Sequence, residues 1–453
     1  MKKTIYKKSP VFIQNLIVTI KNIFVLNKKY GYIPFFNSLN KIQANLNNIK
    51  INYNEKELID ELNLLKDKAI NNTVFYKLNK EKYSTLYKLT DIKQWPILKK
   101  SILKKKNSEF FSKVCNMFNS VVLYTSGTTG TPLKIKVSKN DLRKRYLILL
   151  KAMTDFGFNA TRPLARFTGY DIADNNIIYR KDILNNQFFL SSFHLSKENI
   201  NKYYDVIVKY QISYLKGYPS AIFLLAKLLK ENNLQIDCID AVFTTAEKLH
   251  DYQKEFIENY FNCKVFDYYG SNDQSVLIYT CPYGKLHLAN VTGYLEVLDE
   301  TGNDVKEGEV GSMLVTSFTS SCMPLLRYKI GDSCIISKNQ ECKCNSESLI
   351  IDEIIGRDED IFQTEKGNYI TRFSVFLKKL PSTIIESQLV LNKNKKRVTL
   401  YYVSHEEIKK IKFNTFENEL KNAIGANYKF EYNRVKNIPL TKKGKKKAVK
   451  IEK

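Results

Sequence analysis

Apolar and polar positions divide the chain into three stretches. Residues 1–115 show mainly helical spacing, and the positions that this spacing predicts to be buried are Ile42, Leu46, Leu58, Leu62 and Leu65. From residue 116 to 356, short β-type runs alternate with amphipathic helices, which is the pattern of a layered α/β domain. The last stretch predicts a small α+β domain, with a strand at residues 397–403 and helices at 406–412 and 416–424.

The length of the chain supports a division into two domains. Its 453 residues exceed what one hydrophobic core usually serves. We therefore predict an α/β fold with a large N-terminal domain, residues 1–356, in which β-sheets are flanked by helices and residues 1–115 are mostly helical. A small, mobile C-terminal domain follows over residues 357–453.

Composition narrows the class of partner. The formal net charge of +26 favours anionic partners, such as ATP, a phosphorylated carrier or an acidic saccharide. Nucleic acid is disfavoured because no domain-scale binding motif accompanies the charge, and a generally basic surface explains the charge equally well.

The cysteines and the N-terminus bear on location. Eight cysteines without a disulfide framework, and no secretory signal, predict a reducing compartment, the cytoplasm. Four lysines followed by the apolar residues 11–20 imitate a signal peptide, but Gln14 and Asn15 interrupt the run. No run reaches membrane-spanning length. This first segment is predicted to pack on the body of the protein, with peripheral contact to an anionic membrane as the alternative.

A loop rich in hydroxyl groups and glycine separates two predicted strands. An apolar run precedes it, and Leu133, Ile135 and Val137 alternate with polar residues after it. The chemistry-bearing residues of this region are Thr125, Ser126, Gly127, Thr128, Thr129, Gly130 and Lys134. Converging N–H and O–H groups on a glycine-rich backbone predict a cradle for phosphate. The loop lacks the Walker spacing, and an ordinary hairpin of similar composition is the alternative.

Two further apolar strands end in candidate binding residues. The strand at residues 241–247 ends at Ala246 and Glu247, and the strand at 263–270 ends at Tyr268 and its neighbours. Because ligands bind where the strands of open α/β sheets end, we predict that the two loops share one crevice.

The stretch from Tyr124 to Lys134 resembles the ATP loop of the adenylate-forming superfamily, which includes acyl-CoA synthetases, peptide-synthetase adenylation domains and luciferases. Within it, the chain most resembles the phenylacetate-CoA ligase branch, especially the adenylating proteins associated with capsular polysaccharide biosynthesis. The likeness runs from residues 9–16 to the lysine-rich end of the chain.

The resemblance implies roles for two motifs. Tyr269 and Gly270 match a Tyr-Gly-x-x-Glu motif in which the ring stacks against adenine and the carboxylate helps to hold magnesium. Here the carboxylate is Asp273, which is one methylene shorter than glutamate, so that Mg²⁺ would be met more closely or through water. Residues 327–332 resemble an R-Y-x-x-G-D element whose aspartate, Asp332, accepts hydrogen bonds from both ribose hydroxyls.

The resemblance also implies a hinge and a catalytic lysine. Arg357 lies in a G-R-x-D-D-like hinge and would reach ribose or phosphate, and Glu359 occupies the pivot position. Residues 438–445 resemble a P-x-T-x-x-G-K loop that places Lys445 as the catalytic lysine. A solvated basic tail is the alternative, because residues 434–453 hold nine basic residues against one acid.

Three thiols and one imidazole form a candidate metal site. Cys281, His287, Cys342 and Cys344 would make a closed tetrahedral set for structural Zn²⁺ if the two segments meet. Buried thiols without a metal are the alternative.

The resemblance predicts an ATP- and Mg²⁺-dependent ligase that converts a carboxylic acid into acyl-AMP, releases pyrophosphate and passes the acyl group to CoA. One alternative acceptor is an amine or hydroxyl of a sugar or amino acid in surface polysaccharide biosynthesis. A second alternative is a nucleotide-binding homologue without catalysis. No spacing in the sequence identifies the acid or the oligomeric state.

Overall fold

The structure is a computed structural model of the chain. It describes residues 9–30, 46–124, 133–168, 178–192, 194–357, 362–363, 369–370, 373–377, 379–381, 383–439 and 447–452. These divide into two compact units. We call residues 19–161 and 266–354 the hairpin unit, and residues 1–18, 162–265 and 355–453 the parallel-sheet unit.

The predicted hairpin lies in the hairpin unit. Strands β1 (Ser120–Tyr124) and β2 (Lys134–Ser138) pair in antiparallel register. This confirms that the hydroxyl-rich loop joins two strands, while residues 125–132 themselves lie outside the described residues. The side chain of Ser138 accepts from two backbone N–H groups and caps helix α7 (Lys139–Asp155). The same short segment therefore fixes both the loop's second strand and the start of α7.

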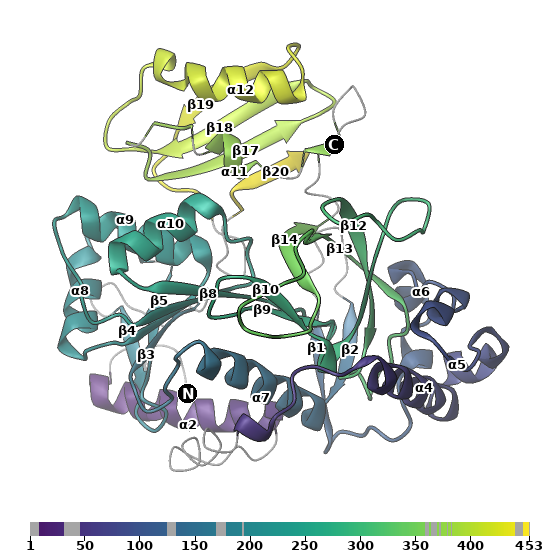
Figure 1. The fold of residues 1–453 in the computed structure, drawn as a ribbon. Coiled ribbons are helices and arrows are strands. Elements are labelled where there is room, and N and C mark those ends of the chain that lie inside the picture. Colours follow the sequence, from purple (N-terminus) through teal and green to yellow (C-terminus); the bar gives the residue numbers. More distant parts are fainter. Residues whose placement is uncertain are drawn as a thin grey trace. The chain divides into compact units, whose positions relative to one another are not determined.

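The hairpin unit also contains a mainly antiparallel sheet and a helical N-terminal part (Figure 1). The strands follow the order β11-β12-β13-β14-β10-β9-β8. Their bounds are β8 Lys264–Tyr269, β9 Leu277–Thr280, β10 Leu286–Ala289, β11 Gly293–Leu298, β12 Val310–Ser317, β13 Tyr328–Ile336 and β14 Ile350–Arg357. The helices are α4 Glu55–Asn72, α5 Val74–Leu78 and α6 Lys100–Lys105.

Short 3-10 segments link these helices, and their bounds are η1 Leu46–Asn48, η2 Lys80–Lys82, η3 Leu89–Gln94 and η4 Asn107–Phe110, with η5 Asn290–Thr292 before β11. Leu46, Leu58, Leu62 and Leu65 are buried as predicted, and Ile42 lies outside the described residues.

The parallel-sheet unit has the strand order β7-β6-β3-β5-β4, in which only β4 pairs antiparallel. Its strands are β3 Leu164–Thr168, β4 Tyr179–Asp182, β5 Gln187–Ser191, β6 Tyr214–Gly217 and β7 Ala241–Thr245. Its helices are α8 Ile200–Lys209, α9 Pro219–Glu231 and α10 Asp251–Phe261. Helix α2 (Val11–Tyr30) runs without a break and belongs to the parallel-sheet unit up to Val18 and to the hairpin unit from Thr19 (Figure 1).

The C-terminal part of the chain forms a separate four-stranded sheet in the order β19-β18-β17-β20. Its elements are β15 Phe362–Gln363, β16 Tyr369–Ile370, α11 Ser374–Leu377, β17 Glu386–Asn392, β18 Arg397–Val403, η7 Lys410–Phe413, α12 Asn414–Ile424, β19 Lys429–Arg434 and β20 Val449–Glu452. The predicted strand at 397–403 and the helix at 416–424 are confirmed.

The predicted helix at 406–412 is wrong, since only the 3-10 turn η7 forms there. Ile408 packs against the core of the C-terminal sheet, but Ile411 stays 71% exposed, so that the segment lacks the continuous apolar stripe that stabilises a surface helix.

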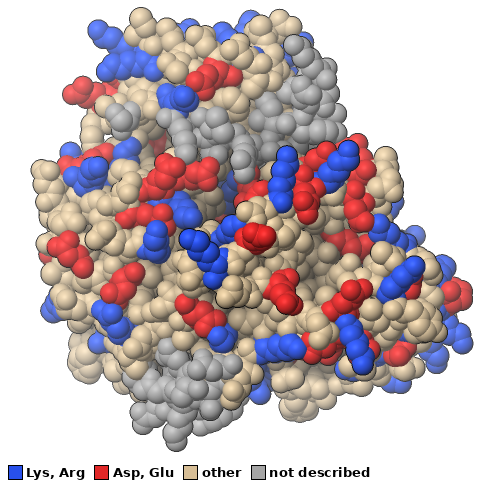
Figure 2. All heavy atoms as spheres, in the orientation of Figure 1, with Lys and Arg blue, Asp and Glu red and all other residues tan. Residues whose placement is uncertain are grey.

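The fold class is confirmed, because sheets and helices form a large N-terminal α/β domain and a smaller C-terminal one. The boundary at residues 356 and 357 stays a prediction. No helix among the described residues is long and apolar enough to cross a membrane. Acidic and basic side chains are interspersed on the face in Figure 2, so that the charge of +26 does not form a field of one sign there.

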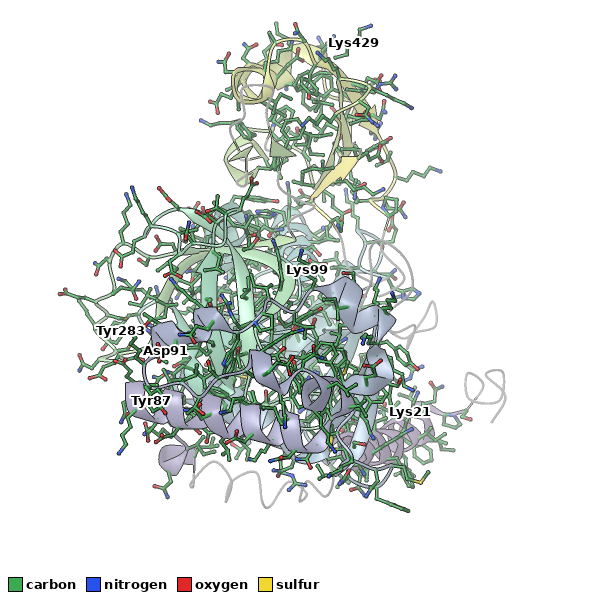
Figure 3. All side chains as sticks on the ribbon, turned by 90° about the vertical axis from the view of Figure 1, so that its right-hand side faces the viewer. Lys21, Tyr87, Asp91, Lys99, Tyr283 and Lys429 are labelled. Atoms are coloured by element: carbon green, nitrogen blue, oxygen red, sulfur yellow. A yellow bond between two sulfur atoms is a disulfide. The ribbon has the colours of Figure 1, made fainter. Side chains whose placement is uncertain are left out.

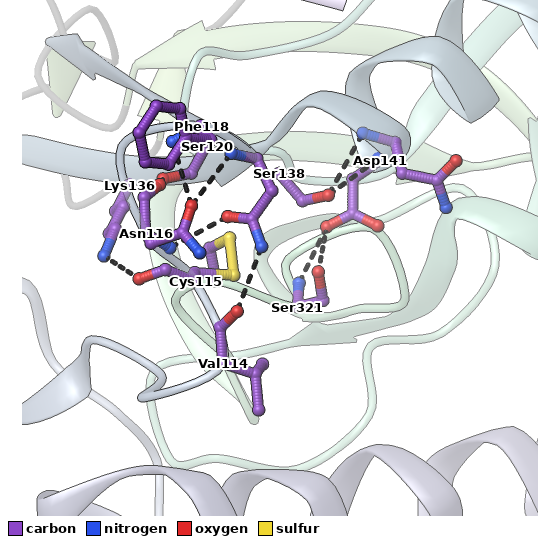
Figure 4. The surroundings of a disulfide bond; sticks show 12 residues. Val114, Cys115, Asn116, Phe118, Ser120, Lys136, Ser138, Asp141 and Ser321 are labelled. Atoms are coloured by element: carbon purple, nitrogen blue, oxygen red, sulfur yellow. Dashed lines mark hydrogen bonds between the residues drawn. A yellow bond between two sulfur atoms is a disulfide. The ribbon is translucent and has the colours of Figure 1, made fainter. Parts of the chain in front are cut away.

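A disulfide joins Cys115 to Cys322, which are 207 positions apart in the sequence and have Cα atoms 5.5 Å apart (Figure 4). The cysteine spacing predicted no disulfide, and for this pair the prediction is wrong. Two cysteines so distant in sequence meet only through packing, here reinforced by the bond from Ser112 N to Cys322 O (3.0 Å). Lys136 donates to the carbonyl of Cys115. The bridge thus links the base of the β1–β2 hairpin to the loop between β12 and β13.

The loop reached by the disulfide is also bound to α7. The Asp141 carboxylate accepts hydrogen bonds from the N–H and the hydroxyl of Ser321, at 2.9 and 2.6 Å (Figure 4). Burial raises the pKa of Asp141, and the two bonds from Ser321 act against that rise. Disulfide and carboxylate together hold this loop in place.

Replacing Cys115 by serine should lower the free energy of unfolding by about 2–4 kcal/mol, because the unfolded chain regains the freedom that the bridge removes. Urea unfolding with and without TCEP measures this. In TCEP, the free energies of unfolding of wild type and Cys115→Ser should become equal, because the reductant breaks the bridge in wild type. Cys238→Ser changes a free cysteine and should unfold like wild type both with and without TCEP. Eight titratable thiols in native protein without reductant would contradict the pairing.

Candidate functional site

The loop between β8 and β9 is the centre of the candidate site. It is held at three points within the hairpin unit. Tyr269 donates its hydroxyl to Asp332 Oδ2 at 2.7 Å, and Asn272 Nδ2 donates to the carbonyl of Tyr124 at 3.1 Å. Arg145, from α7, donates to the carbonyl of Ser275. The second contact sets this loop beside the last residue before the hydroxyl-rich loop.

The pair of Tyr269 and Asp332 joins two motifs that the sequence analysis singled out. Burial raises the pKa of Tyr269 well above its ordinary value, and the negative charge of Asp332 raises it further. The phenol therefore stays protonated and keeps donating to the carboxylate. Gly331, just before Asp332, has φ +81°, a left-handed conformation that glycine adopts without strain. This explains the glycine of the motif.

Arg327, the arginine of the same motif, has a structural role. Its guanidinium makes a buried two-point pair with Glu296, at 3.0 and 2.8 Å, and donates to the carbonyl of Trp95 at 2.6 Å. Burial raises the pKa of Glu296, while the hydrogen bond and charge of Arg327 lower it. Such a paired, hydrogen-bonded ion pair fixes the start of β13, four residues before Gly331.

Arg145 is a site residue that sequence reasoning missed. It also donates to Thr319 Oγ1 at 3.1 Å, so that it ties the β8–β9 loop to the loop after β12. Burial lowers the pKa of Arg145 to about 10, and the nearby charge of Asp273 opposes that shift. The available signal was its spacing of four from Asp141, which places two opposite charges on one face of α7. The sequence did not distinguish this case from an exposed helix, on which two opposite charges four residues apart form only a solvated surface pair.

Asp273 is only 4% exposed and lies in the same loop as Tyr269. Its carboxylate offers the hard oxygen atoms that Mg²⁺ prefers. The positive charge of Arg145 acts on the same carboxylate. The carboxylate of Asp273 therefore fits magnesium in its donor chemistry, while the positive charge of Arg145 weakens the attraction between that carboxylate and Mg²⁺.

The remaining described candidates are placed as follows. Lys134 is exposed on β2, with Nζ 5.6 Å from the ring centroid of Phe111. Tyr268 is half-buried on β8, and Gly270 follows that strand. The structure brings Tyr269, Gly270, Asp273 and Asp332 together in the hairpin unit.

Ala246 and Glu247 belong to the parallel-sheet unit, directly after β7. Ala246 has φ +69°, which costs energy in a residue with a Cβ atom and occurs where the surrounding structure imposes it. Glu247 accepts from the backbone N–H of Ser220 at 3.3 Å, at the start of α9. This carboxylate therefore complements the positive end of a helix. That the two strand ends share one crevice stays a prediction.

Three predicted functions fall on parts that are not described. Residues 125–130 and Lys445 lie outside the described residues, as does Glu359. Arg357 is the last residue of β14, and its side chain is not described. The segment around Lys445 is nevertheless anchored at both ends, since Ile438 is buried and β20 pairs in parallel with β17. A wholly solvated basic tail is therefore excluded for residues 447–452.

The four predicted metal ligands meet in the hairpin unit. The ligand atoms of Cys281, His287, Cys342 and Cys344 all lie within 4.8 Å of one another. The two sulfur atoms of Cys281 and Cys342 are 3.6 Å apart, and Cys344 Sγ is 3.4 Å from His287 Nε2. A tetrahedral Zn²⁺ site has sulfur–sulfur edges of about 3.8 Å and sulfur–nitrogen edges of about 3.5 Å.

The surroundings of this cluster suit a metal. His287 Nδ1 lies 3.0 Å from Ser348 Oγ, which leaves Nε2 facing the three sulfur atoms. Burial lowers the pKa of His287, so that its imidazole is neutral, as a ligand must be. A hydroxyl on the second ring nitrogen is the usual way to orient a histidine ligand. The cluster therefore fits Zn²⁺ in ligand type, spacing and support.

Comparison with protein families and curated proteins gives three matches. Residues 362–452 match the family model of the CapK C-terminal domain. The chain is 26% identical over 464 residues to protein CapK of Staphylococcus aureus, covering 98% of this chain and 97% of that protein. It is 32% identical over 100 residues to phenylacetate-coenzyme A ligase of Thermus thermophilus, which covers 22% of each chain.

Among solved structures, the fold matches 2-hydroxyisobutyryl-CoA ligase in the postadenylation state, in complex with 2-HIB-AMP. The TM-score is 0.69 at 18% identity, over 87% of this chain and 89% of the ligase. The order of motifs in the sequence predicted this relationship. The chain is thus homologous to CapK and to phenylacetate-CoA ligase, and it has the fold of the acyl-CoA ligases of the adenylate-forming superfamily.

Proposed function

We propose that this chain is an ATP-dependent ligase that activates a carboxylic acid as acyl-AMP and releases pyrophosphate. The observation that carries the proposal is the hydrogen bond from Tyr269 to Asp332, in a loop that also contacts Tyr124. These two contacts place Tyr269, Asp332 and Tyr124, the residue before the hydroxyl-rich loop, close together in the hairpin unit. Candidate binding groups that meet in this way support the proposal that one nucleotide binds there.

The comparisons support the same activity. A homologue over nearly the whole chain is CapK, and a second is a CoA ligase by name. The structural neighbour described above was solved with an acyl-AMP, and the same ligase was solved in an open conformation with CoA. The acid named for that enzyme, 2-hydroxyisobutyrate, is not carried over to this chain, and we assign no acid to it.

Asp332 and Tyr269 form the proposed nucleoside subsite. A carboxylate has about four acceptor positions, and Tyr269 uses one at Oδ2. The vicinal hydroxyls of a ribose would bind the same carboxylate, and the ring of Tyr269 would stack on adenine. The proposed phosphate subsite consists of residues 125–130 and Lys134, with Ala246, Glu247, Tyr268 and Arg357 as further nucleotide contacts.

In the proposed reaction, an oxygen of the acid forms a bond to the α-phosphorus of ATP while the bond to the bridging oxygen of pyrophosphate breaks. Negative charge spreads over the phosphoryl oxygens, and positioning with electrostatic stabilisation supplies most of the catalysis. Lys445 would contribute a positive charge. Asp273 would hold Mg²⁺, which neutralises phosphate charge when it is bound.

The acceptor of the acyl group is the second half of the proposal. CoA is the default because the structural neighbours are CoA ligases. An amine or hydroxyl of a sugar or amino acid is the alternative, and the match to CapK along 98% of the chain favours it.

Arg145 favours a different candidate function, a nucleotide-binding protein without catalysis. Its buried positive charge acts on Asp273, the carboxylate proposed to hold magnesium. A protein that retained the nucleotide subsite but lost Mg²⁺ binding would bind ATP without cleaving it.

ATP–pyrophosphate exchange with a panel of carboxylic acids tests the activity. One acid should support exchange. Lys445→Ala should reduce the exchange rate by at least about a hundredfold and leave ATP binding intact, because the lysine is proposed to stabilise the negative charge that develops on the phosphoryl oxygens only in the transition state. Lys446→Ala, at the adjacent lysine, is the matched control and should retain exchange.

The same assay separates the alternatives. If an acid supports exchange and a thioester forms when CoA is added, CoA is the acyl acceptor. Exchange that is indifferent to CoA supports an amine or hydroxyl acceptor. ATP binding without exchange for any acid, in the wild-type protein, would overturn the proposal and favour the non-catalytic homologue.

Two substitutions separate the charge of Arg145 from its hydrogen bonds. Arg145→Gln removes the cation beside Asp273, so that the Mg²⁺ concentration required for half-maximal exchange should fall several-fold. Arg145→Lys keeps the charge and loses the two-point geometry, so that the Mg²⁺ requirement should stay unchanged while exchange slows about tenfold. An equal Mg²⁺ requirement in both variants would mean that Arg145 does not act on the metal subsite.

We propose in addition that Cys281, His287, Cys342 and Cys344 hold structural Zn²⁺. The four ligand atoms lie close enough for one tetrahedral ion, and no position remains open for a substrate. They connect the β9–β10 turn to the segment before β14, so that the ion would cross-link two distant parts of one sheet.

Metal analysis of purified protein should give about one zinc per chain. The double variant Cys342→Ser/Cys344→Ser should lose the zinc and melt several degrees lower, because binding to the folded state no longer contributes stability. The control Cys238→Ser/Cys263→Ser, at two free cysteines outside the cluster, should retain the metal. Metal-free wild-type protein with the same melting temperature in the presence and absence of added zinc would refute the site.

A further inference from the structure

Helix α2 exposes a row of apolar side chains. Phe12, Leu16, Ile20 and Phe24 recur at every fourth position and are 68%, 49%, 45% and 70% exposed. We call these four residues the α2 stripe. Val11 and Val25 are also exposed. Apolar residues four apart lie on one helical face, so that the stripe is a continuous surface rather than scattered single residues.

The side of α2 that packs on the protein is mixed, because its two most buried residues are polar while several apolar residues are half-buried. Gln14 and Thr19 are nearly inaccessible to solvent. Asn15 Oδ1 accepts from the backbone N–H of Lys181 at 3.0 Å, and the carbonyl of Tyr30 accepts from Arg143 Nη2 at 2.9 Å. These polar contacts set the rotation of the helix, so that the apolar stripe faces outward.

Positive charge borders the stripe. Lys21 is exposed beside Ile20, and Lys28 continues the four-residue row beyond Phe24 (Figure 3 labels Lys21). The first 54 residues of the chain contain nine lysines and no acidic residue, since Glu55 is the first acid. Lysine side chains beside an apolar face can place their amines at the level of lipid headgroups.

We propose that the α2 stripe is a membrane-binding face that lies in the surface of a bilayer rich in anionic phospholipid. Its apolar side chains would enter the headgroup and acyl-chain boundary, and Lys21 and Lys28 would contact phosphate. The helix lies on the membrane and does not span it, because α2 is not apolar enough to cross. A second copy of the chain fits this face less well, because pairing two such segments brings lysines together with no acid to neutralise them.

This face would keep an enzyme of surface polymer chemistry near the membrane, but the inference does not depend on the proposed ligase activity. It depends on the exposure of the stripe and on its charge. Vesicle binding can therefore succeed or fail whatever the outcome of pyrophosphate exchange.

The test is sedimentation of the full-length protein with vesicles of phosphatidylcholine alone, or of phosphatidylcholine with phosphatidylglycerol at about 3:1. Wild type should bind the anionic vesicles, and binding should fall steeply as salt rises, because the Debye length shortens from about 10 Å at 0.1 M to about 3 Å at 1 M. Phe12→Gln/Phe24→Gln should reduce the partition coefficient by about tenfold or more. Lys21→Gln/Lys28→Gln should reduce binding to the anionic vesicles and leave any binding to phosphatidylcholine vesicles unchanged.

The matched control is Leu78→Gln/Tyr87→Gln, which removes two equally exposed apolar side chains far from α2 in the sequence and should bind like wild type. Circular dichroism and melting temperature check folding, and the single variant Phe24→Gln serves if the double variant unfolds. Wild type that stays in the supernatant with both vesicles would overturn the proposal. Stripe variants that bind anionic vesicles as well as wild type would also overturn it. A stripe variant whose only change is from dimer to monomer in light scattering would show instead that the stripe binds a second copy of the chain.

Discussion

The hydrogen bond between Tyr269 and Asp332 is the contact on which the candidate site depends. It joins the end of β8 to β13 across 63 residues, and it is supported on both sides. On one side, Arg327 and Glu296 fix the start of β13, and Gly331 allows the turn that presents the carboxylate. On the other, Asn272 and Arg145 hold the β8–β9 loop. A site fixed at several points is organised before any ligand arrives, which reduces the cost of binding.

Three charged side chains of this unit that are wholly or partly buried are hydrogen-bonded, and each one holds a loop. Asp141 holds Ser321, Arg145 bridges Ser275 and Thr319, and Arg327 binds Glu296. An unpaired charge in such surroundings would cost several kcal/mol, so that each partner stabilises the loop that carries the other. The disulfide acts on the same loop after β12 through Cys322. Site geometry and stability of the hairpin unit thus rest on the same few contacts.

Cross-links between distant segments are a second theme. The Cys115–Cys322 bridge spans 207 residues, and the cysteine–histidine cluster joins β10 to the segment around Cys342 and Cys344. The bridge ties the segment before β1 to a loop of the large sheet, and a metal ion bound at the cluster would tie two parts of that sheet together. The α2 stripe differs from these features, because its four apolar side chains are 45–70% exposed to solvent.

The sequence by itself determined the local elements and the order of the motifs. An apolar run predicted β1, alternation predicted β2, and the strand at residues 397–403 was predicted to the residue, because hydrogen bonding and side-chain periodicity within one segment suffice for these. Periodicity failed at residues 406–412, where only the 3-10 turn η7 forms and Ile411 stays exposed. Only the tertiary structure decided that Arg145 serves the site, that Cys115 meets Cys322 and that α2 turns its apolar side outward. Each of these depends on contacts between residues far apart in the chain, and a linear pattern carries no information on which distant groups will share a buried space.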